Sequence, residues 1–197
     1  MTHLGGSFYV GDANAPVQIA DESGSLFDAG TQVANASSMA PSTVMAATLA
    51  SYQSYIVNLG NIIKTTIIID LTGAKSVATD HDVIGDTGAC HIGQITAAVN
   101  GSIFKGQMGC IEVPTTGADD IDLYSSTASD GAYNADASGL AGAAAVVTAG
   151  GANAIGTVKP FTTLPAANTY LYLASGEAVA GTYDAGIIYL EMWGYTS

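Results

Sequence analysis

The stretch Ile63-Lys64-Thr65-Thr66-Ile67-Ile68-Ile69-Asp70-Leu71-Thr72-Gly73 decides the fold that we expect. Four of its residues are isoleucine, three are threonine, and it ends at a glycine. Because β-branched side chains fit a pleated surface better than a helix, this is the clearest strand in the sequence. The segment before it carries no charged residue from Ala29 to Ile63. We therefore expect an N-terminal attachment and oligomerisation segment, residues 1–62, followed by a β-sandwich domain, residues 63–197.

Short apolar segments continue from this stretch to the C-terminus, separated by turn-forming residues such as Gly150-Gly151. In the last segment, Ile188, Leu190 and Met192 alternate with Tyr189, Glu191 and Trp193, which predicts one buried and one more exposed side. The eight predicted strands are residues 64–71, 90–98, 102–113, 120–125, 142–148, 155–161, 168–174 and 186–195. Strands at this spacing predict a mainly β protein, an antiparallel β-sandwich of the jelly-roll type.

Two local patterns refine this prediction. Asn100-Gly101 lies between two predicted strands, and we expect a two-residue hairpin turn there, because Asn and Gly tolerate positive φ angles. Tyr170 and Tyr172, together with Tyr189 and Trp193, form an outward aromatic row on two strands. Aromatic side chains concentrate at interfaces, so this row is a candidate interface, and packing under loops is the alternative.

A helical pattern precedes the first strand. Apolar residues recur at intervals of 4, 3, 4, 3 and 4, namely at Met45, Leu49, Tyr52, Ile56, Leu59 and Ile63. This spacing predicts a short amphipathic helix that starts near Pro41 and ends near Gly60. The repeat covers fewer than three heptads and lacks flanking charges. Two interpretations of this helix remain: it forms an interface between copies of the chain, or it packs on its own domain.

Residues 1–40 are rich in Gly, Ala, Ser, Asn and Asp, with only short apolar clusters. Such a segment buries too little area to offset its own ordering entropy, so we expect it to become ordered against other chains. The predicted partner-binding residues lie in this arm and in the predicted helix. They are Phe8, Tyr9, Leu26, Phe27, Met45, Leu49, Tyr52 and Ile56.

The charge balance narrows the function classes. The net charge is −13, and all four basic residues are lysines. Four scattered lysines cannot form the cationic patch that nucleic acids require, and the same deficit argues against anionic membranes and phosphate-handling enzymes.

Met1–Gly6 has neither the basic region nor the apolar run of a signal peptide, and no apolar run approaches the ~20 residues of a membrane span. We expect no nucleic-acid or membrane partner.

Catalytic motifs are weak. His81 lies between Asp80 and Asp82, which could orient it as a general base, but no Gly-x-Ser-x-Gly elbow accompanies it. A solvated loop histidine is the alternative. Carboxylates are plentiful, so the sequence does not exclude a glycosidase that uses a pair of acidic residues. The prediction is nevertheless a non-enzymatic protein without catalytic residues or cofactor.

The two cysteines give no metal or disulfide motif. Cys90-His91 and the distant Cys110 offer three soft ligands, but adjacent strand residues point to opposite faces. Two cysteines make no disulfide framework, although they could pair across neighbouring strands. We predict two reduced, buried thiols.

One acidic stretch is the weak candidate for a metal site. Hard oxygen ligands at this density could hold calcium, although their order does not match an EF-hand and acidic residues also solvate loops. The candidates are Asp119, Asp120 and Asp122, followed by Asp130, Asn134 and Asp136.

Five segments carry a resemblance to a known group of proteins. They are Thr66–Leu71, Gly93–Thr96, Gly117–Tyr124, Leu164–Leu173 and Gly181–Tyr195, and with their connections they cover roughly two thirds of the chain. In them the sequence resembles virion surface proteins of tailed phages, of the head-decoration and fibre type, particularly phages of marine bacteria and cyanobacteria. The resemblance implies a β C-terminal domain, an N-terminal attachment segment and often a trimer, and it carries no catalytic residues.

These observations predict a structural protein that decorates or cements the capsid surface of a phage virion, as a trimeric knob or short fibre. Its partners would be the major capsid protein or another virion protein, and further copies of itself. Its location would be the virion, assembled in the host cytoplasm. The alternatives are a receptor- or carbohydrate-binding tip of a tail fibre and a bacterial glycan-binding module.

Overall fold

The computed structural model describes residues 39–148 and 150–196, and only backbone strands within residues 1–38. Strands make up 47% of the residues and helices 8%, which confirms the predicted mainly β fold. The N-terminal strands are β1 (Thr2–Leu4), β2 (Ser7–Asp12), β3 (Ala15–Ala20), β4 (Phe27–Asp28), β5 (Thr31–Gln32) and β6 (Ala34–Asn35). Of these, β1, β2 and β3 form an antiparallel sheet and β4 pairs with β5.

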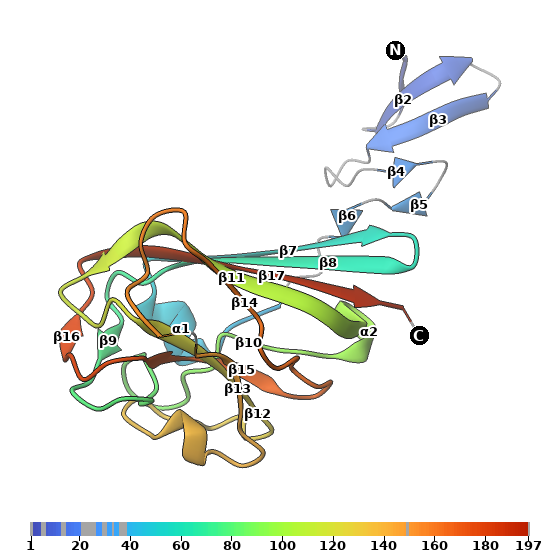
Figure 1. Cartoon of the computed structure of the whole chain (residues 1–197). Helices are drawn as coiled ribbons and strands as arrows, with labels where there is room; N and C mark the ends of the chain where they lie inside the picture. The colour runs from blue at the N-terminus through green and yellow to red at the C-terminus, as the bar shows by residue number, and fades with distance from the viewer. Residues whose placement is uncertain are drawn as a thin grey trace.

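Two antiparallel sheets stack to form the β-sandwich (Figure 1). The large sheet has the order β14-β11-β17-β8-β7-β6 and the small sheet the order β10-β15-β12-β13. The large sheet contains β7 (Ser51–Leu59), β8 (Ile62–Asp70), β11 (Ser102–Thr115), β14 (Val158–Pro160) and β17 (Ala185–Tyr195). The small sheet contains β10 (Gly93–Gln94), β12 (Ile121–Ser126), β13 (Ala144–Val147) and β15 (Tyr170–Ser175). A separate ribbon pairs β9 (Lys75–Ser76) with β16 (Gly181–Thr182).

The connections between the sheets make this sandwich a jelly roll. Counting only β8, β10 to β15 and β17, and numbering them one to eight along the chain, the large sheet reads 6-3-8-1 and the small sheet 2-7-4-5. All neighbours are antiparallel, as two interlocked Greek keys require. Each of the eight predicted strands overlaps one of these eight, so the predicted sandwich is confirmed.

The core lies between the two sheets and follows the alternation of the strands. In the register of β8 with β17, Ile67 lies opposite Leu190 and Ile69 opposite Ile188, and all four side chains are fully buried. Burying such a side chain contributes about 1.5–3 kcal/mol. The small sheet completes this core with the buried residues Ile121, Leu123, Leu171 and Leu173.

The helix predicted from Pro41 to Gly60 is wrong beyond its first turns. Helix α1 spans only Thr43–Thr48, and the Oγ of Ser42 caps it by accepting the Met45 N–H at 3.1 Å. The chain then forms β7, which pairs with β8 along its whole length. The isoleucine-rich β8 offers a sheet edge whose hydrogen bonds and packing outweigh the weak helical periodicity. A domain boundary at residue 62 would therefore fall inside the β7–β8 hairpin.

The hairpin predicted at Asn100-Gly101 is also wrong. Residues Ala97–Asn100 form the short helix α2, with Thr96 at its N-terminus and Gly101 at its C-terminus. Because β10 and β11 lie in different sheets, a two-residue turn cannot join them. Gly101 does have a positive φ of 69°, but as a helix cap, and a Cβ there would lie 2.6 Å from the Tyr195 carbonyl oxygen. No helix among the described residues is long and apolar enough to cross a membrane.

Candidate functional site

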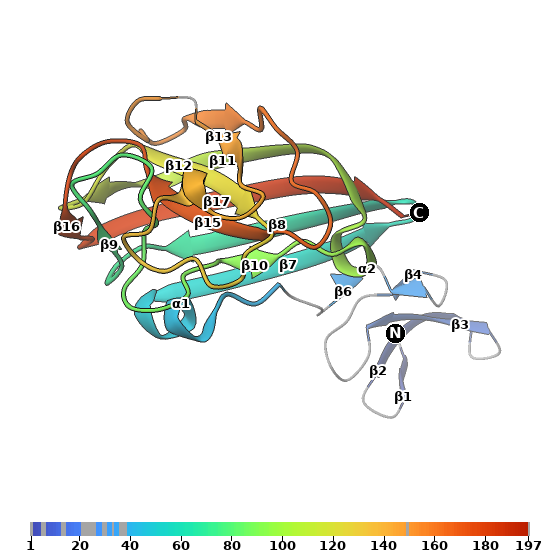
Figure 2. The ribbon, with the colours of Figure 1, turned by 90° about the horizontal axis from the view of Figure 1, so that it is seen from below.

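The outer faces of the two sheets differ in what covers them. On the outer side of the small sheet, the side chains of Asp122, Tyr124 and Tyr172 are buried. Figure 2, seen from the side of the small sheet, shows the connections between β9 and β10 and between β12 and β13 on this side. The Tyr172 hydroxyl donates to the Ala128 carbonyl at 2.7 Å, which fixes the second connection over the sheet. We call this side the covered face.

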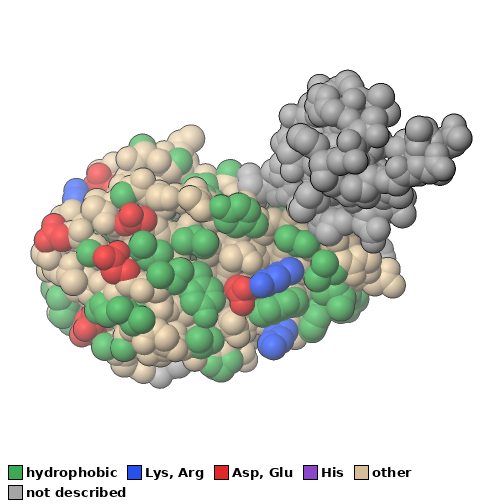
Figure 3. Space-filling model, turned by 90° about the horizontal axis from the view of Figure 1, so that it is seen from above, with side chains coloured by type: hydrophobic (Ala, Val, Ile, Leu, Met, Phe, Trp, Pro, Cys, Tyr) green, Lys and Arg blue, Asp and Glu red, His purple; other side chains and the backbone are tan. Residues whose placement is uncertain are grey.

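The outer face of the large sheet carries exposed side chains in the part of the chain that the structure describes. Its exposed side chains include Tyr55 of β7, Ile111 of β11 and Val158 of β14, which are 51%, 47% and 46% exposed. Figure 3 shows hydrophobic side chains spread over this side of the described part of the molecule. We call it the open face, with the residues Tyr55, Lys64, Ile68, Lys105, Gln107, Ile111, Val158, Tyr189, Glu191 and Trp193.

Trp193 lies between two lysines on this face. In the strand register it is opposite Lys64 of β8 on one side and Lys105 of β11 on the other. The two Nζ atoms lie 5.5 Å and 5.0 Å from the Trp193 ring, within the range of a cation–π contact. Lys64 also forms a 2.5 Å ion pair with Glu191, which accepts a hydrogen bond from Gln107 at 2.9 Å. The centre of the open face is therefore an ordered aromatic and polar cluster.

Tyr189 packs flat on the same face because β11 has a glycine beside it. Gly109 lies opposite Tyr189 in the register, and a Cβ on this glycine would come 2.3 Å from the tyrosine ring. The ring can therefore lie across the neighbouring strand. The result is a smooth apolar area beside Trp193.

The structure divides the predicted aromatic row between the two sheets. Tyr189 and Trp193 lie on the open face, whereas Tyr170 and Tyr172 belong to the small sheet. Tyr172 is fully buried under a loop, and the His91 ring packs 4.9 Å from the Tyr170 ring. Of the four aromatic residues, only Tyr189 and Trp193 are therefore candidates for the predicted interface.

The described members of the predicted partner-binding set do not form a shared surface. Met45, Leu49 and Ile56 are buried within the chain itself, so their assignment to a partner interface is wrong. The half-buried Tyr52 donates its hydroxyl to the Ile92 carbonyl at 2.7 Å. The side chains of the remaining predicted residues, Phe8, Tyr9, Leu26 and Phe27, lie outside the described residues.

The three calcium candidates have separate roles. The buried Asp120 forms a 2.9 Å ion pair with the buried Lys159 and accepts the Gly151 N–H at 2.5 Å. Asp119 lies beside Glu177, and burial followed by this neighbouring carboxylate raises its pKa. Because Lys159 already compensates Asp120, the three aspartates do not form the predicted calcium site.

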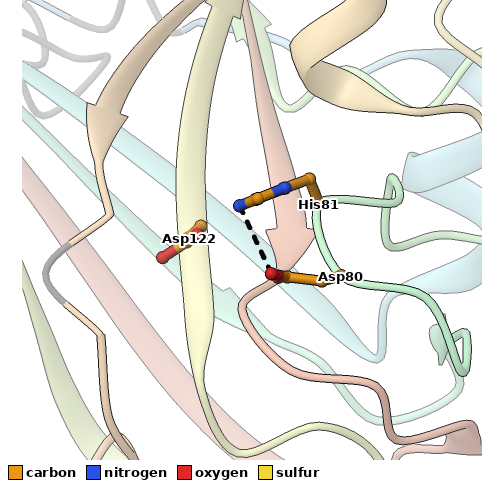
Figure 4. A group of neighbouring side chains, drawn as sticks. All are labelled: Asp80, His81 and Asp122. Atoms are coloured by element: carbon orange, nitrogen blue, oxygen red, sulfur yellow. Dashed lines mark ion pairs between the residues drawn. The ribbon is translucent and has the colours of Figure 1, made fainter.

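Asp122 lies beside two residues that are distant from it in the sequence, Asp80 and His81. The three residues lie together on the side of the covered face (Figure 4). One ligand atom from each of Asp80, His81 and Asp122 lies within 4.8 Å of the other two. His81 Nε2 is 3.5 Å from Asp80 Oδ2. Burial, and after it the charge of Asp120, raise the pKa of Asp122 to about 6. The Asp80-His81 pair was visible in the sequence, but only the fold brings Asp122 of β12 beside it.

The two thiols are free and buried, as predicted, and burial raises the pKa of both Cys90 and Cys110. Burial also lowers the pKa of His91, which therefore favours its neutral form.

The fold and the surface define a jelly-roll protein with one covered and one open outer face. Comparison of the chain with protein-family models, curated proteins and solved structures finds no match. The residues of the open face and their chemistry are therefore the basis for a proposed function.

Proposed function

We propose that the chain is a non-enzymatic structural protein of a phage virion, which decorates or cements the capsid surface through its open face. The observation that carries this proposal is the apolar, solvent-exposed outer side of the large sheet. Contiguous exposed apolar surface on a soluble domain is characteristic of a site where another protein binds. The sequence resemblance described above points to the virion as the setting.

The fold agrees with this role but does not decide it. Jelly rolls occur in viral capsid and lectin domains, and a fold alone does not determine function. What favours assembly is the placement of side chains. Trp193, Tyr189 and Tyr55 are residue types enriched at the centre of protein interfaces, and they stand on β17 and β7, the two strands that flank β8 in the large sheet.

Charge also favours docking on this side. The chain has a net charge of −13, yet two of its four lysines, Lys64 and Lys105, lie on the open face. Lys64 pairs with Glu191, so Lys105 leaves the centre of the face with one net positive charge. An acidic molecule can approach an acidic partner there with less repulsion than through its other surfaces.

The partner in this proposal is the major capsid protein or another virion protein. Copies of the chain associate as a trimer, and the sparsely charged N-terminal residues add a second attachment. The protein acts in the virion after assembly in the host cytoplasm.

Co-sedimentation with undecorated phage heads tests the proposal. The variant Tyr189→Ala/Trp193→Ala should bind at least tenfold more weakly than the wild type, because aromatic residues at an interface centre dominate binding energy. The matched control is Tyr133→Ala, which removes a half-buried tyrosine from the opposite side. The control should bind like the wild type. Undiminished binding of the double variant in a folded protein would reject the open face as the docking surface.

The cluster around Trp193 also favours a second candidate function, receptor or glycan binding at a fibre tip. An indole ring between two lysines, beside the Gln107–Glu191 hydrogen bond, combines an apolar surface with polar groups that a sugar could use. A glycan array distinguishes the two functions. Glycan binding that Trp193→Ala abolishes, without binding to heads, would favour this second function.

A further inference from the structure

One oxygen of the buried Asp122 carboxylate has no hydrogen-bond partner among the described residues. The Asp122 side chain projects from β12 toward the covered face and is 4% exposed. Its Oδ1 accepts no hydrogen bond from any described residue. Asp120, two residues earlier, has both the Lys159 ammonium and the Gly151 N–H as donors. Because buried carboxylates are normally paired or coordinate a cation, Asp122 lacks what Asp120 has.

Two potential metal ligands face this carboxylate. Asp80 and His81, from the connection between β9 and β10, each place a ligand atom within 4.8 Å of an Asp122 oxygen (Figure 4). Their side chains are 53% and 41% exposed. The group therefore has one buried ligand and two ligands at the solvent side, where an ion can enter and water can complete its coordination.

The backbone holds His81 in place. Its N–H donates to the Ser175 carbonyl at 2.7 Å, and its own carbonyl accepts the Ala137 N–H at 2.9 Å. Its ring contacts Tyr124 edge-on, with ring centres 5.9 Å apart. These contacts tie the histidine to β15 and to the connection after β12, so the imidazole is positioned next to Asp122 before any ion binds.

We propose that Asp80, His81 and Asp122 bind a divalent transition-metal ion such as Zn²⁺. One imidazole nitrogen and two carboxylate oxygens form a donor set that suits Zn²⁺ better than Ca²⁺, which prefers six to eight oxygens. The two carboxylates neutralise the charge of the ion. The bound ion joins the β9–β10 connection to β12, and thereby stabilises the covered face.

The geometry requires only a small adjustment. Ligand bonds to Zn²⁺ of about 2.0–2.2 Å place tetrahedral ligand atoms roughly 3.4 Å apart. The His81 Nε2–Asp80 Oδ2 distance of 3.5 Å already meets this value. The remaining separations, of up to 4.8 Å, close by movement of the two exposed side chains. This inference concerns the opposite side of the molecule from the open face, and it does not depend on the proposed function.

Isothermal titration of the untagged, EDTA-dialysed full chain with ZnCl₂, in a reductant that does not bind zinc, tests this site. The wild type should bind one zinc ion, and Asp122→Asn and His81→Gln should each bind at least tenfold more weakly. The matched control Asp130→Asn removes the same charge from an exposed loop position and should bind like the wild type. CaCl₂ should give no saturable binding at comparable concentrations.

Thermal unfolding provides the second readout. Zinc should raise the melting temperature of the wild type and of Asp130→Asn but not of Asp122→Asn, because a ligand stabilises only a protein that binds it. If His81→Gln does not fold, Asp80→Asn replaces it, since the Asp80 side chain is exposed. Equal zinc affinity in all variants, absence of saturable zinc binding, or calcium binding as tight as zinc would each overturn the proposal.

Discussion

The outward tyrosines of β17 and β15 experience opposite surroundings, although both strands alternate in the same way. Tyr189 of β17 lies on the open face, whereas Tyr172 of β15 is fully buried and donates its hydroxyl to the Ala128 carbonyl. The difference comes from the connections, which lie over the small sheet, whereas the outer face of the large sheet keeps exposed side chains among the described residues. Strand periodicity therefore tells which residues share a face, and the loops decide whether that face is available to a partner.

Two aspartates of one segment, Asp120 and Asp122, also differ in their surroundings. Asp120 is buried with the Lys159 ammonium and the Gly151 N–H as donors, while Oδ1 of the buried Asp122 has no hydrogen-bond partner among the described residues. The first should stabilise the fold as a pair, and the second should cost stability when no ion is bound. The following predictions test these contrasts, in order of decreasing effect.

The largest effect is expected at Leu190, which points into the core from β17. Leu190→Asp would place an unpaired carboxylate between the sheets and should prevent folding. Glu191→Gln, one residue along on the open face, keeps an acceptor for Gln107 and should change stability by no more than about 1 kcal/mol. Circular dichroism and urea unfolding measure both. Similar tolerance of the two changes would mean that the facing of β17 is wrong.

The next effect concerns the buried ion pair. Lys159→Met should destabilise the protein by about 3–5 kcal/mol, because it leaves Asp120 buried and uncompensated. The double variant Asp120→Leu/Lys159→Met should recover much of this loss, since no unpaired charge remains. Urea unfolding of the single and double variants gives the coupling energy. Strictly additive losses would contradict a direct pairing of the two side chains.

A smaller effect of opposite sign is expected at Asp122. Its pKa of about 6 in the folded protein lies above the ordinary value of 3.8, so its ionisation disfavours folding as the pH rises through this range. In EDTA at pH 7, Asp122→Asn should therefore stabilise the protein by about 1–3 kcal/mol, and the gain should shrink toward pH 5. Thermal unfolding at several pH values measures it. A loss of stability, or a gain independent of pH, would show that Asp122 is compensated in the folded state.

The smallest effect is expected for reductant. Cys90 and Cys110 are free and buried, so reductant should leave the melting temperature unchanged. A disulfide would contribute about 2–4 kcal/mol, and its loss would lower the melting temperature by many degrees. Such a decrease would contradict the assignment of two free thiols.

The sequence predicted the strands well because their signals are local. The run Ile67-Ile68-Ile69 and the alternation around Leu190 both correspond to strands that pair with each other in the large sheet. The helix prediction failed at β7, where Tyr52 and Ile56 matched a helical period, because Gly60 was taken as the end of a helix. In the structure Gly60-Asn61 is the two-residue turn that joins β7 to β8. The hairpin prediction at Asn100-Gly101 failed because a turn signal does not indicate which sheet the next strand enters.

The candidate site was less predictable than the fold. Trp193 was recognised as outward-facing, but its two lysines come from strands distant in sequence. The unpaired state of Asp122 depends on which of two nearby aspartates reaches Lys159, and spacing cannot show this. Chemistry that depends on three-dimensional partners therefore needs the structure, even where the strands do not.

Hydroxyl-radical footprinting of the full chain, free and bound to undecorated heads, tests most directly the claim that the open face is the docking surface. Mass spectrometry then measures oxidation of Trp193, the single tryptophan of the chain, and of Tyr133 on the opposite side as internal reference. The account predicts that binding protects Trp193 several-fold and leaves Tyr133 unchanged. Protection of Tyr133 with no change at Trp193 would contradict it.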